Sequence, residues 1–73
     1  MSLSEIFVER LRETILKRGI TQIDLARILD VRQSRVSAYF VGRSFPSVEM
    51  LVKICDALGV SADYLLGRTD KPS

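Results

Sequence analysis

The sequence predicts a compact all-α fold of five short helices, and three observations support that prediction. Apolar residues recur at intervals of three and four, and no segment alternates apolar and polar residues as a strand does. Residues that begin or stop helices punctuate the chain at short intervals. We expect one domain over residues 1–73, with a core of about 3–67 and a frayed tail over 68–73.

The first helix is expected to run from about Leu3 to Arg18. Apolar residues at steps of four form one stripe that we expect to face the core: Leu3, Phe7, Leu11 and Ile15. The basic Lys17 and Arg18 suit the negative end of the helix dipole, and Gly19 is the left-handed residue at which such helices end.

The second helix is expected from Gln22 to Leu29. Thr21 can cap it through its hydroxyl, and Asp24, three residues later, can return the hydrogen bond. The residues that we expect this helix to bury are Leu25, Ala26 and Leu29. Asp30 then ends the helix, because aspartate tolerates a left-handed backbone better than most residues other than glycine.

The third helix is expected from about Gln33 to Val41, ending at Gly42. After a loop with the sequence RSFPS, Ser47 caps a fourth helix from Val48 to Leu58 that ends at Gly59. The residues that we expect the fourth helix to bury are Val48, Leu51, Val52, Cys55 and Leu58. Ser61 caps a short fifth helix with the sequence ADYLL, and Gly67 closes it.

The residue types argue against an enzyme, a metal site and a membrane span. There is no histidine, so Cys55 has no base partner, and its spacing places it on a buried helix face. The carboxylates are scattered singly, and no glycine-rich loop could hold a phosphate. The longest apolar run is four residues, and the first ten residues carry two glutamates, unlike a secretory signal. We therefore expect a cytoplasmic protein without enzymatic activity, cofactor or metal.

The positive charge is concentrated in the middle of the chain. The formal net charge is only +2, but residues 21–46 hold four arginines and two aspartates, while residues 47–73 are slightly acidic. We therefore expect a polyanion to meet the middle of the chain.

The two helices in this middle part carry side chains at the spacing that a tight helix pair needs. Ala26 leaves room at a close crossing, Asp30 turns the chain, and Val36 and Tyr39 anchor the following helix. This pattern resembles the helix-turn-helix of the lambda-repressor/Cro-like family, also called XRE-type regulators. The segments RGITQIDLARILDV and VGRSFPSVEMLVKICDALGVSADYLLG extend the resemblance over nearly the whole chain.

The resemblance implies a lambda-repressor-like DNA-binding domain, with the third helix in the major groove of double-stranded DNA. Gln33 can then bond adenine through two hydrogen bonds, Arg35 can reach guanine or a phosphate, and Ala38 can contact a thymine methyl. The implied base contacts are Gln33, Ser34, Arg35, Ser37 and Ala38. The implied phosphate contacts are Gln22, Arg32 and Arg43, while Arg27 is left open between phosphate contact and surface charge.

Three departures from the family pattern are informative. Arg32 stands where relatives usually have a Ser or Thr cap, and Asp30 replaces the usual turn glycine. Ile15 and Phe40 stand where many members pair an arginine with a glutamate. Since replacing both partners of an ion pair is tolerated better than replacing one, we expect Ile15 to pack on Phe40.

We therefore expect a sequence-specific repressor that binds a palindromic operator as a homodimer, with half-sites about 34 Å apart. Residues 64–68 and Phe45 are the expected dimer surface. Double-stranded DNA and a second copy are the expected partners, without a membrane or a small-molecule effector. The alternative is a helical protein-interaction module, an antitoxin or adaptor, with secondary DNA binding. The polar, basic start of the third helix favours DNA, because an interaction module need not keep it.

Overall fold

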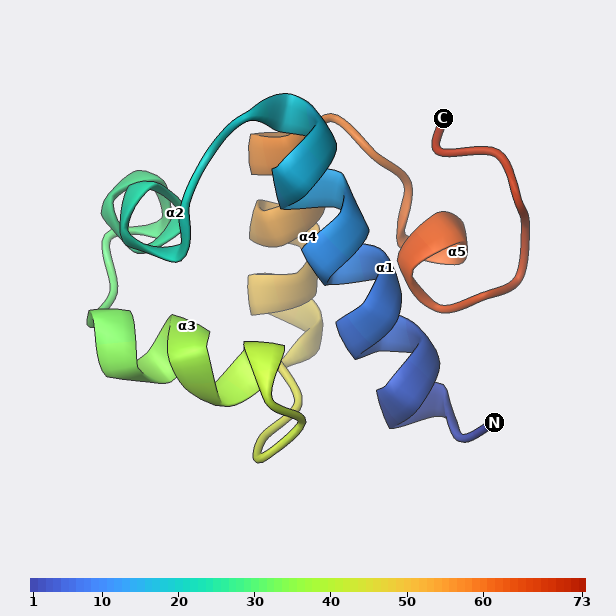
Figure 1. Ribbon diagram of the computed structural model, residues 1–73, viewed down its shortest axis with the longest axis horizontal. Coiled ribbons are helices and arrows are strands. Elements are labelled where there is room, and N and C mark those ends of the chain that lie inside the picture. Colours follow the sequence, from blue (N-terminus) through green and yellow to red (C-terminus); the bar gives the residue numbers. More distant parts are fainter.

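The chain folds into five α-helices joined by short turns, as the computed structural model in Figure 1 shows for all of residues 1–73. The helices are α1 (Leu3–Arg18), α2 (Gln22–Leu29), α3 (Gln33–Phe40), α4 (Val48–Leu58) and α5 (Ala62–Leu65). The expected all-α class is confirmed, and the helix bounds agree with the sequence to within a residue. None of these helices combines the length and the apolar character that crossing a membrane requires.

The helices surround one apolar core. Figure 1 shows α2 and α3 together on one side of α1 and α4, with α5 and the C-terminus on the other side. The largest side chains that are fully buried come from all five helices: Phe7, Phe40, Leu11, Leu25, Ile54, Leu65 and Val36. This arrangement leaves the outer surfaces of α2 and α3 free on the side away from the C-terminus.

The predicted helix caps are confirmed for the second helix. The Thr21 hydroxyl accepts the Asp24 N–H at 3.1 Å, and the Asp24 carboxylate accepts the Thr21 N–H at 2.9 Å. The hydrogen bond that the Asp24 carboxylate accepts from the Thr21 N–H is the largest cause that lowers the pKa of Asp24. The interaction with the Thr21 side chain is the second and lowers this pKa further. This stabilisation is therefore present above the ordinary pKa of aspartate and is lost as the pH falls through the lowered value. Asp30 ends α2 in the predicted left-handed conformation, with φ 57°.

The expected buried stripe on α1 is only partly correct. Phe7 and Leu11 are buried, but Leu3 is 53% exposed and Ile15 is only half-buried. An α-helix has about 3.6 residues per turn, so a line of residues at steps of four drifts around the helix axis. The first member of the stripe has therefore turned away from the core.

The expected buried face of α4 is also partly wrong. Cys55 and Leu58 are buried, but Val48 is 79% exposed and Val52 is 52% exposed. Met50 and Ile54 are buried instead, so the buried line runs through every fourth residue from Met50 to Leu58. Apolar residues occur on two sides of this helix, and its packing against α1, α2 and α5 decides which side is covered.

The C-terminal tail is not frayed as expected. The Arg10 side chain on α1 donates a hydrogen bond to the Thr69 carbonyl and forms an ion pair with Asp70 at 3.1 Å. The Ser61 N–H donates to the Pro72 carbonyl at 2.7 Å. Partners distant in sequence therefore hold the tail against α1 and the start of α5.

Candidate nucleic-acid interface

The turn between α2 and α3 brings the two helices into close contact. Ala26 is 4% exposed, and its carbonyl accepts the Val31 N–H at 3.0 Å across the left-handed Asp30. A larger side chain in place of Ala26 would push the helices apart, because interiors are close-packed. The local chemistry of this turn therefore sets the direction in which α3 leaves α2.

One face of α3 is anchored in the core. Val36, Tyr39 and Phe40 are almost fully buried, which confirms the anchoring predicted for Val36 and Tyr39. At the end of this helix, the Arg12 side chain of α1 donates a hydrogen bond from Nε to the Phe40 carbonyl at 3.1 Å. Ile15 packs against the core that contains Phe40, and its direct contact with that ring stays a prediction.

The five predicted base-contact residues occupy the positions of α3 that are not buried in the core. Gln33, Ser34 and Arg35 are exposed, whereas Ser37 and Ala38 are half-buried. Residues four apart lie one above the other on a helix, so Gln33 with Ser37 and Ser34 with Ala38 form two adjacent rows. Arg35 lies at the flank of this surface, because the residue four positions on is the buried Tyr39.

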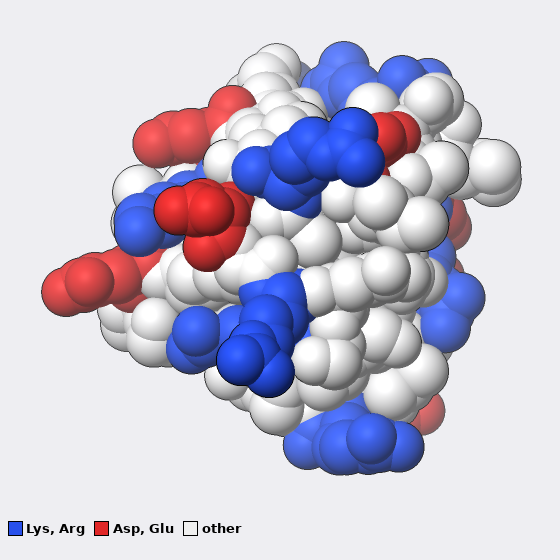
Figure 2. Space-filling model, turned by 90° about the vertical axis from the view of Figure 1, so that its left-hand side faces the viewer, with Lys and Arg blue, Asp and Glu red and all other residues white.

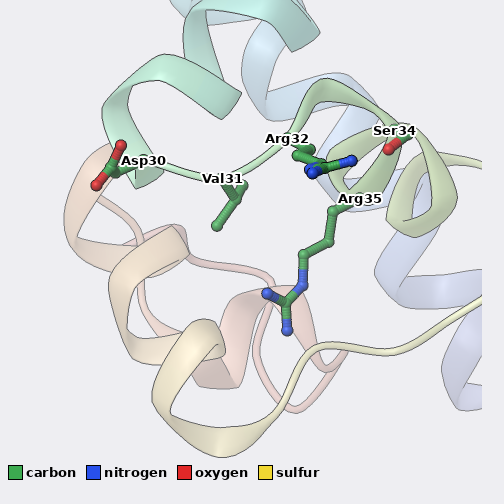
Figure 3. A pocket seen from close by; sticks show the side chains of 5 residues that line it. All are labelled: Asp30, Val31, Arg32, Ser34 and Arg35. Carbon is green, nitrogen blue, oxygen red and sulfur yellow. The ribbon is translucent and has the colours of Figure 1, made fainter.

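The N-terminal end of α3 has no cap from its own sequence. Arg32 occupies the cap position without a side-chain hydrogen bond to the helix, and the first turn contains no acidic residue. Arg32, Ser34 and Arg35 line an open groove of about 500 Å³ together with Asp30 and Val31. Figure 3 shows these side chains, with Asp30 at the far side of Val31. Free N–H groups at a helix start and two arginines favour an anion at this place.

The predicted phosphate contacts lie at the ends of the same two helices. Gln22 begins α2, Arg32 is the N-cap residue just before α3, and Arg43 lies in the loop after α3. Arg43 is exposed, and its backbone N–H donates to the Ala38 carbonyl at 3.0 Å, which fixes the loop after the helix.

Figure 2 views the side on which α2 and α3 lie, and shows several separate basic groups, with most acidic atoms toward the upper left. The basic groups are therefore spread over this surface, as contacts to a long polyanion require.

Two residues near this surface were not singled out by the sequence. Val41, at the end of α3, is 58% exposed and lies in line with Ser34 and Ala38 at steps of four and three. That spacing is visible in the sequence and would have identified it. The hydrogen bond between Arg12 and the Phe40 carbonyl joins residues 28 positions apart, so no local sequence pattern predicts it.

Cys55 is buried in α4, as predicted. Burial raises the pKa of its thiol, and the neighbouring Asp56 raises it further. The thiol therefore stays protonated at neutral pH and acts as a small apolar side chain in the core.

Comparisons with known proteins agree with this geometry. A family model described as Helix-turn-helix matches residues 8–65. The chain is 33% identical over 64 residues to the SPbeta prophage-derived uncharacterized HTH-type transcriptional regulator YonR of Bacillus subtilis, and 34% identical over 62 residues to the HTH-type transcriptional regulator ImmR of the same organism. The matches cover 88% and 85% of this chain but only 59% and 49% of those relatives.

Solved structures are similar over most of the chain. The hypothetical transcription factor NHTF from Neisseria superposes with a TM-score of 0.83 and 29% identity, covering 89% of this chain and 75% of that chain. The clp gene regulator ClgR from C. glutamicum superposes with a TM-score of 0.79 and 32% identity, covering 90% and 86%. The helix-turn-helix family whose model matches residues 8–65 consists of DNA-binding regulators and not of enzymes. From the match of the family model and the identity to these regulators, the chain belongs to the XRE-type helix-turn-helix family of transcriptional regulators.

Proposed function

We propose that this chain binds double-stranded DNA in a sequence-specific manner and represses transcription by occupying a palindromic operator as a homodimer. In this proposal α3 lies in the major groove, and two copies contact half-sites about 34 Å apart, one helical turn of DNA. The proposal includes a cytoplasmic location, because the operator DNA has to be within reach. Residues 64–68 with Phe45 stay a predicted dimer surface.

One observation carries the proposal: α3 is anchored by one face and presents an exposed polar and basic face at an uncapped start. An internal structural helix of this size would normally carry its own N-cap, as each of the other helices does. On α3 the same position holds Arg32, which opposes the helix dipole in the free protein. A DNA phosphate at this place would satisfy both the helix start and the arginine.

The proposal is tested first by DNA binding at several salt concentrations. Fluorescence anisotropy with random duplexes should show an association constant that decreases with salt. Its logarithm should fall linearly with the logarithm of the salt concentration, since each neutralised phosphate releases counterions. Selection from a random duplex library should then return a site with two-fold symmetry. If no duplex binds even at low salt, the protein-interaction module becomes the better description.

Gln33→Ala should lower the affinity for the best operator by about 1–3 kcal/mol and relax the preference at one base pair. The reason is that the amide of Gln33 can bond adenine through two hydrogen bonds, whereas alanine offers none. Competition between the selected operator and its single-base variants measures the effect. Equal losses on operator and random DNA would contradict a base contact.

Arg43→Ala should weaken binding to all duplexes to a similar degree and reduce the salt slope by about one. The residue is exposed in the loop after α3, where its charge is available to a phosphate. Anisotropy titrations at five salt concentrations, with operator and random duplexes, measure both quantities. A change of base preference with an unchanged salt slope would contradict the phosphate contact.

Arg32→Ser should change stability and binding in opposite directions. A serine at this N-cap position should stabilise the free protein by about 1 kcal/mol, because its hydroxyl can accept an N–H of the first turn. DNA binding should weaken, with the salt slope reduced by about one, because one phosphate contact is lost. Urea unfolding and anisotropy on the same preparation measure the two effects, and a loss of both stability and affinity would contradict this role for Arg32.

A further inference from the structure

Two arginines of α1 donate hydrogen bonds to the carbonyls that end other helices. Arg12 Nε donates to the carbonyl of Phe40, the last residue of α3, at 3.1 Å. Arg18 Nε donates to the carbonyl of Leu58, the last residue of α4, at 2.9 Å. The last carbonyls of a helix have no partner within it and carry the negative end of its dipole, so a guanidinium suits them. Of these two arginines, only Arg12 holds the helix that carries the predicted base contacts.

The Phe40 carbonyl depends on Arg12 for its hydrogen bond. The backbone N–H groups of residues 41–44 all donate to the carbonyls of residues 37–39 and bypass Phe40. The last turn of α3 contains no basic residue of its own. Arg12 therefore supplies from α1 the cap that the sequence of α3 does not provide.

The Arg12 side chain binds this carbonyl although acidic side chains are close by. Glu5 and Glu9 line the same groove of about 550 Å³ between α1 and the end of α3. The two ion pairs of the chain nevertheless form elsewhere, and Arg12 takes part in neither. Its placement is therefore explained by the end of α3 and not by pairing of charges along α1.

The two ends of α3 are held by different interactions. Its start follows the tight turn in which the Val31 N–H bonds to the Ala26 carbonyl. Its end is held by the buried side chains of Tyr39 and Phe40 and by the bond from Arg12. Apolar burial is non-directional, so it keeps the helix on the core without fixing its tilt. A hydrogen bond has a preferred distance and angle, and it therefore fixes the direction of the helix end.

The length of α3 shows how much its tilt matters. With eight residues, this helix is about 12 Å long. A tilt of about 10° around its first residue moves its last turn by about 2 Å, whereas N–H···O bonds form only within a range of about 0.5 Å. Ser37 and Ala38 lie in this last turn, so such a tilt takes their predicted base contacts out of reach.

We propose that Arg12 is a positioning residue for base recognition. Its hydrogen bond to the Phe40 carbonyl holds the last turn of α3 at the angle that reading the bases requires, and Arg12 itself contacts no base. The proposal rests on the proposed function, in which α3 lies in the major groove.

Arg12→Gln and Arg12→Met separate this hydrogen bond from the charge of Arg12. Both remove the cation, but Nε2 of glutamine is as many bonds from Cα as Nε of arginine and still donates, whereas methionine has no donor. Anisotropy gives the affinities for the duplex selected from a random library and for a random duplex. Arg12→Met should lower the ratio of these affinities at least about tenfold, the value of one base contact. Arg12→Gln should keep the ratio within about threefold of the wild type, because the donor remains.

Arg18→Met is the matched control, because it removes the same charge and the same kind of hydrogen bond at the end of α4. Arg18 also donates to the Gly59 carbonyl at 3.4 Å, so its loss tests stability at least as severely. Both methionine variants should lower the melting temperature by about 4–8 °C, the shift expected for one hydrogen bond in a domain of this size. Only Arg12→Met should change the affinity ratio, since α4 carries no predicted DNA contact.

Residual dipolar couplings of the DNA-free protein measure the angle between α1 and α3 directly. Arg12→Met should change the couplings of the α3 N–H groups, while Arg12→Gln and Arg18→Met should leave them as in the wild type. A library selection that returns no preferred sequence would count against the proposed function. The couplings would still decide in that case whether Arg12 positions α3.

Four results would overturn the proposal. Equal losses of the affinity ratio in Arg12→Gln and Arg12→Met would assign the effect to charge. Equal losses of Arg12→Met on both duplexes, with a salt slope reduced by about one, would make Arg12 a phosphate contact. A similar loss of the ratio in Arg18→Met would point to general destabilisation, and unchanged α3 couplings in Arg12→Met would show that α3 keeps its angle without this bond.

Discussion

Phe40→Glu should unfold the domain or leave it without a cooperative transition. Phe40 is fully buried at 0% exposure, so the variant would place an unpaired carboxylate in the core. A charge left buried without a partner costs about 3–5 kcal/mol, which is comparable to the whole stability of a small domain. Urea unfolding followed by circular dichroism measures the loss. Val41→Glu, one residue later on a side chain that is 58% exposed, is the control and should change stability by less than about 0.5 kcal/mol.

Adding Ile15→Arg to Phe40→Glu should recover part of the lost stability. The two substitutions recreate the arginine and glutamate that the family resemblance places at these positions. If Ile15 packs on Phe40, the new arginine lies within reach of the new carboxylate, and the double variant should regain the cooperative urea transition that Phe40→Glu lacks. A double variant no more stable than Phe40→Glu would show that Ile15 and Phe40 are not neighbours.

Arg10→Met should lower the free energy of unfolding by about 2–3 kcal/mol. The Arg10 guanidinium donates hydrogen bonds to the carbonyls of Tyr64, at 2.9 Å, and Thr69, and its Cζ lies 4.5 Å from the centre of the Tyr64 ring. Methionine keeps the apolar stem but removes every donor and leaves the two carbonyls without this partner. Thermal unfolding should show a midpoint lower by roughly 10–20 °C, since about 1 kcal/mol shifts a domain of this size by 4–8 °C.

Asp70→Asn is the matched control for Arg10. The Asp70 side chain is 99% exposed, so its ion pair with Arg10 is screened by water and should contribute less than about 0.5 kcal/mol. The two variants thus separate the hydrogen bonds to the carbonyls from the surface ion pair. An equal loss in both would mean that the tail is held by charge alone.

Helix ends were predictable because their chemistry is local. The Thr21 hydroxyl and the Asp24 carboxylate meet within one turn, and Gly19 and Asp30 adopt left-handed backbones at the predicted places. The partners in each case are separated by at most five residues. Short-range hydrogen bonding and backbone preference therefore determine these features before any packing occurs.

The placement of the predicted base-contact residues on one helix was predictable to a similar degree, while their contacts with DNA stay a prediction. All five predicted base-contact residues lie on α3, and the anchoring side chains Val36 and Tyr39 are buried behind them. The order of polar and apolar residues along one helix carries this information. The sequence could not rank Arg35 against Ser34, because the exposure of each side chain depends on which side of α3 turns toward the core, and packing decides that.

Taken alone, the sequence determined the number and ends of the helices, the helix-turn-helix spacing and the family. Tertiary structure alone decided that Ile54 is buried while Val52 faces water, that Arg10 holds the C-terminal tail, and that Arg12 reaches the Phe40 carbonyl. The physical reason is the distance along the sequence between the groups that interact. A cap or a turn involves groups within a few residues, whereas the contacts of Arg10 with the tail join groups as many as 60 positions apart. Only packing selects among the apolar and basic residues available for such contacts.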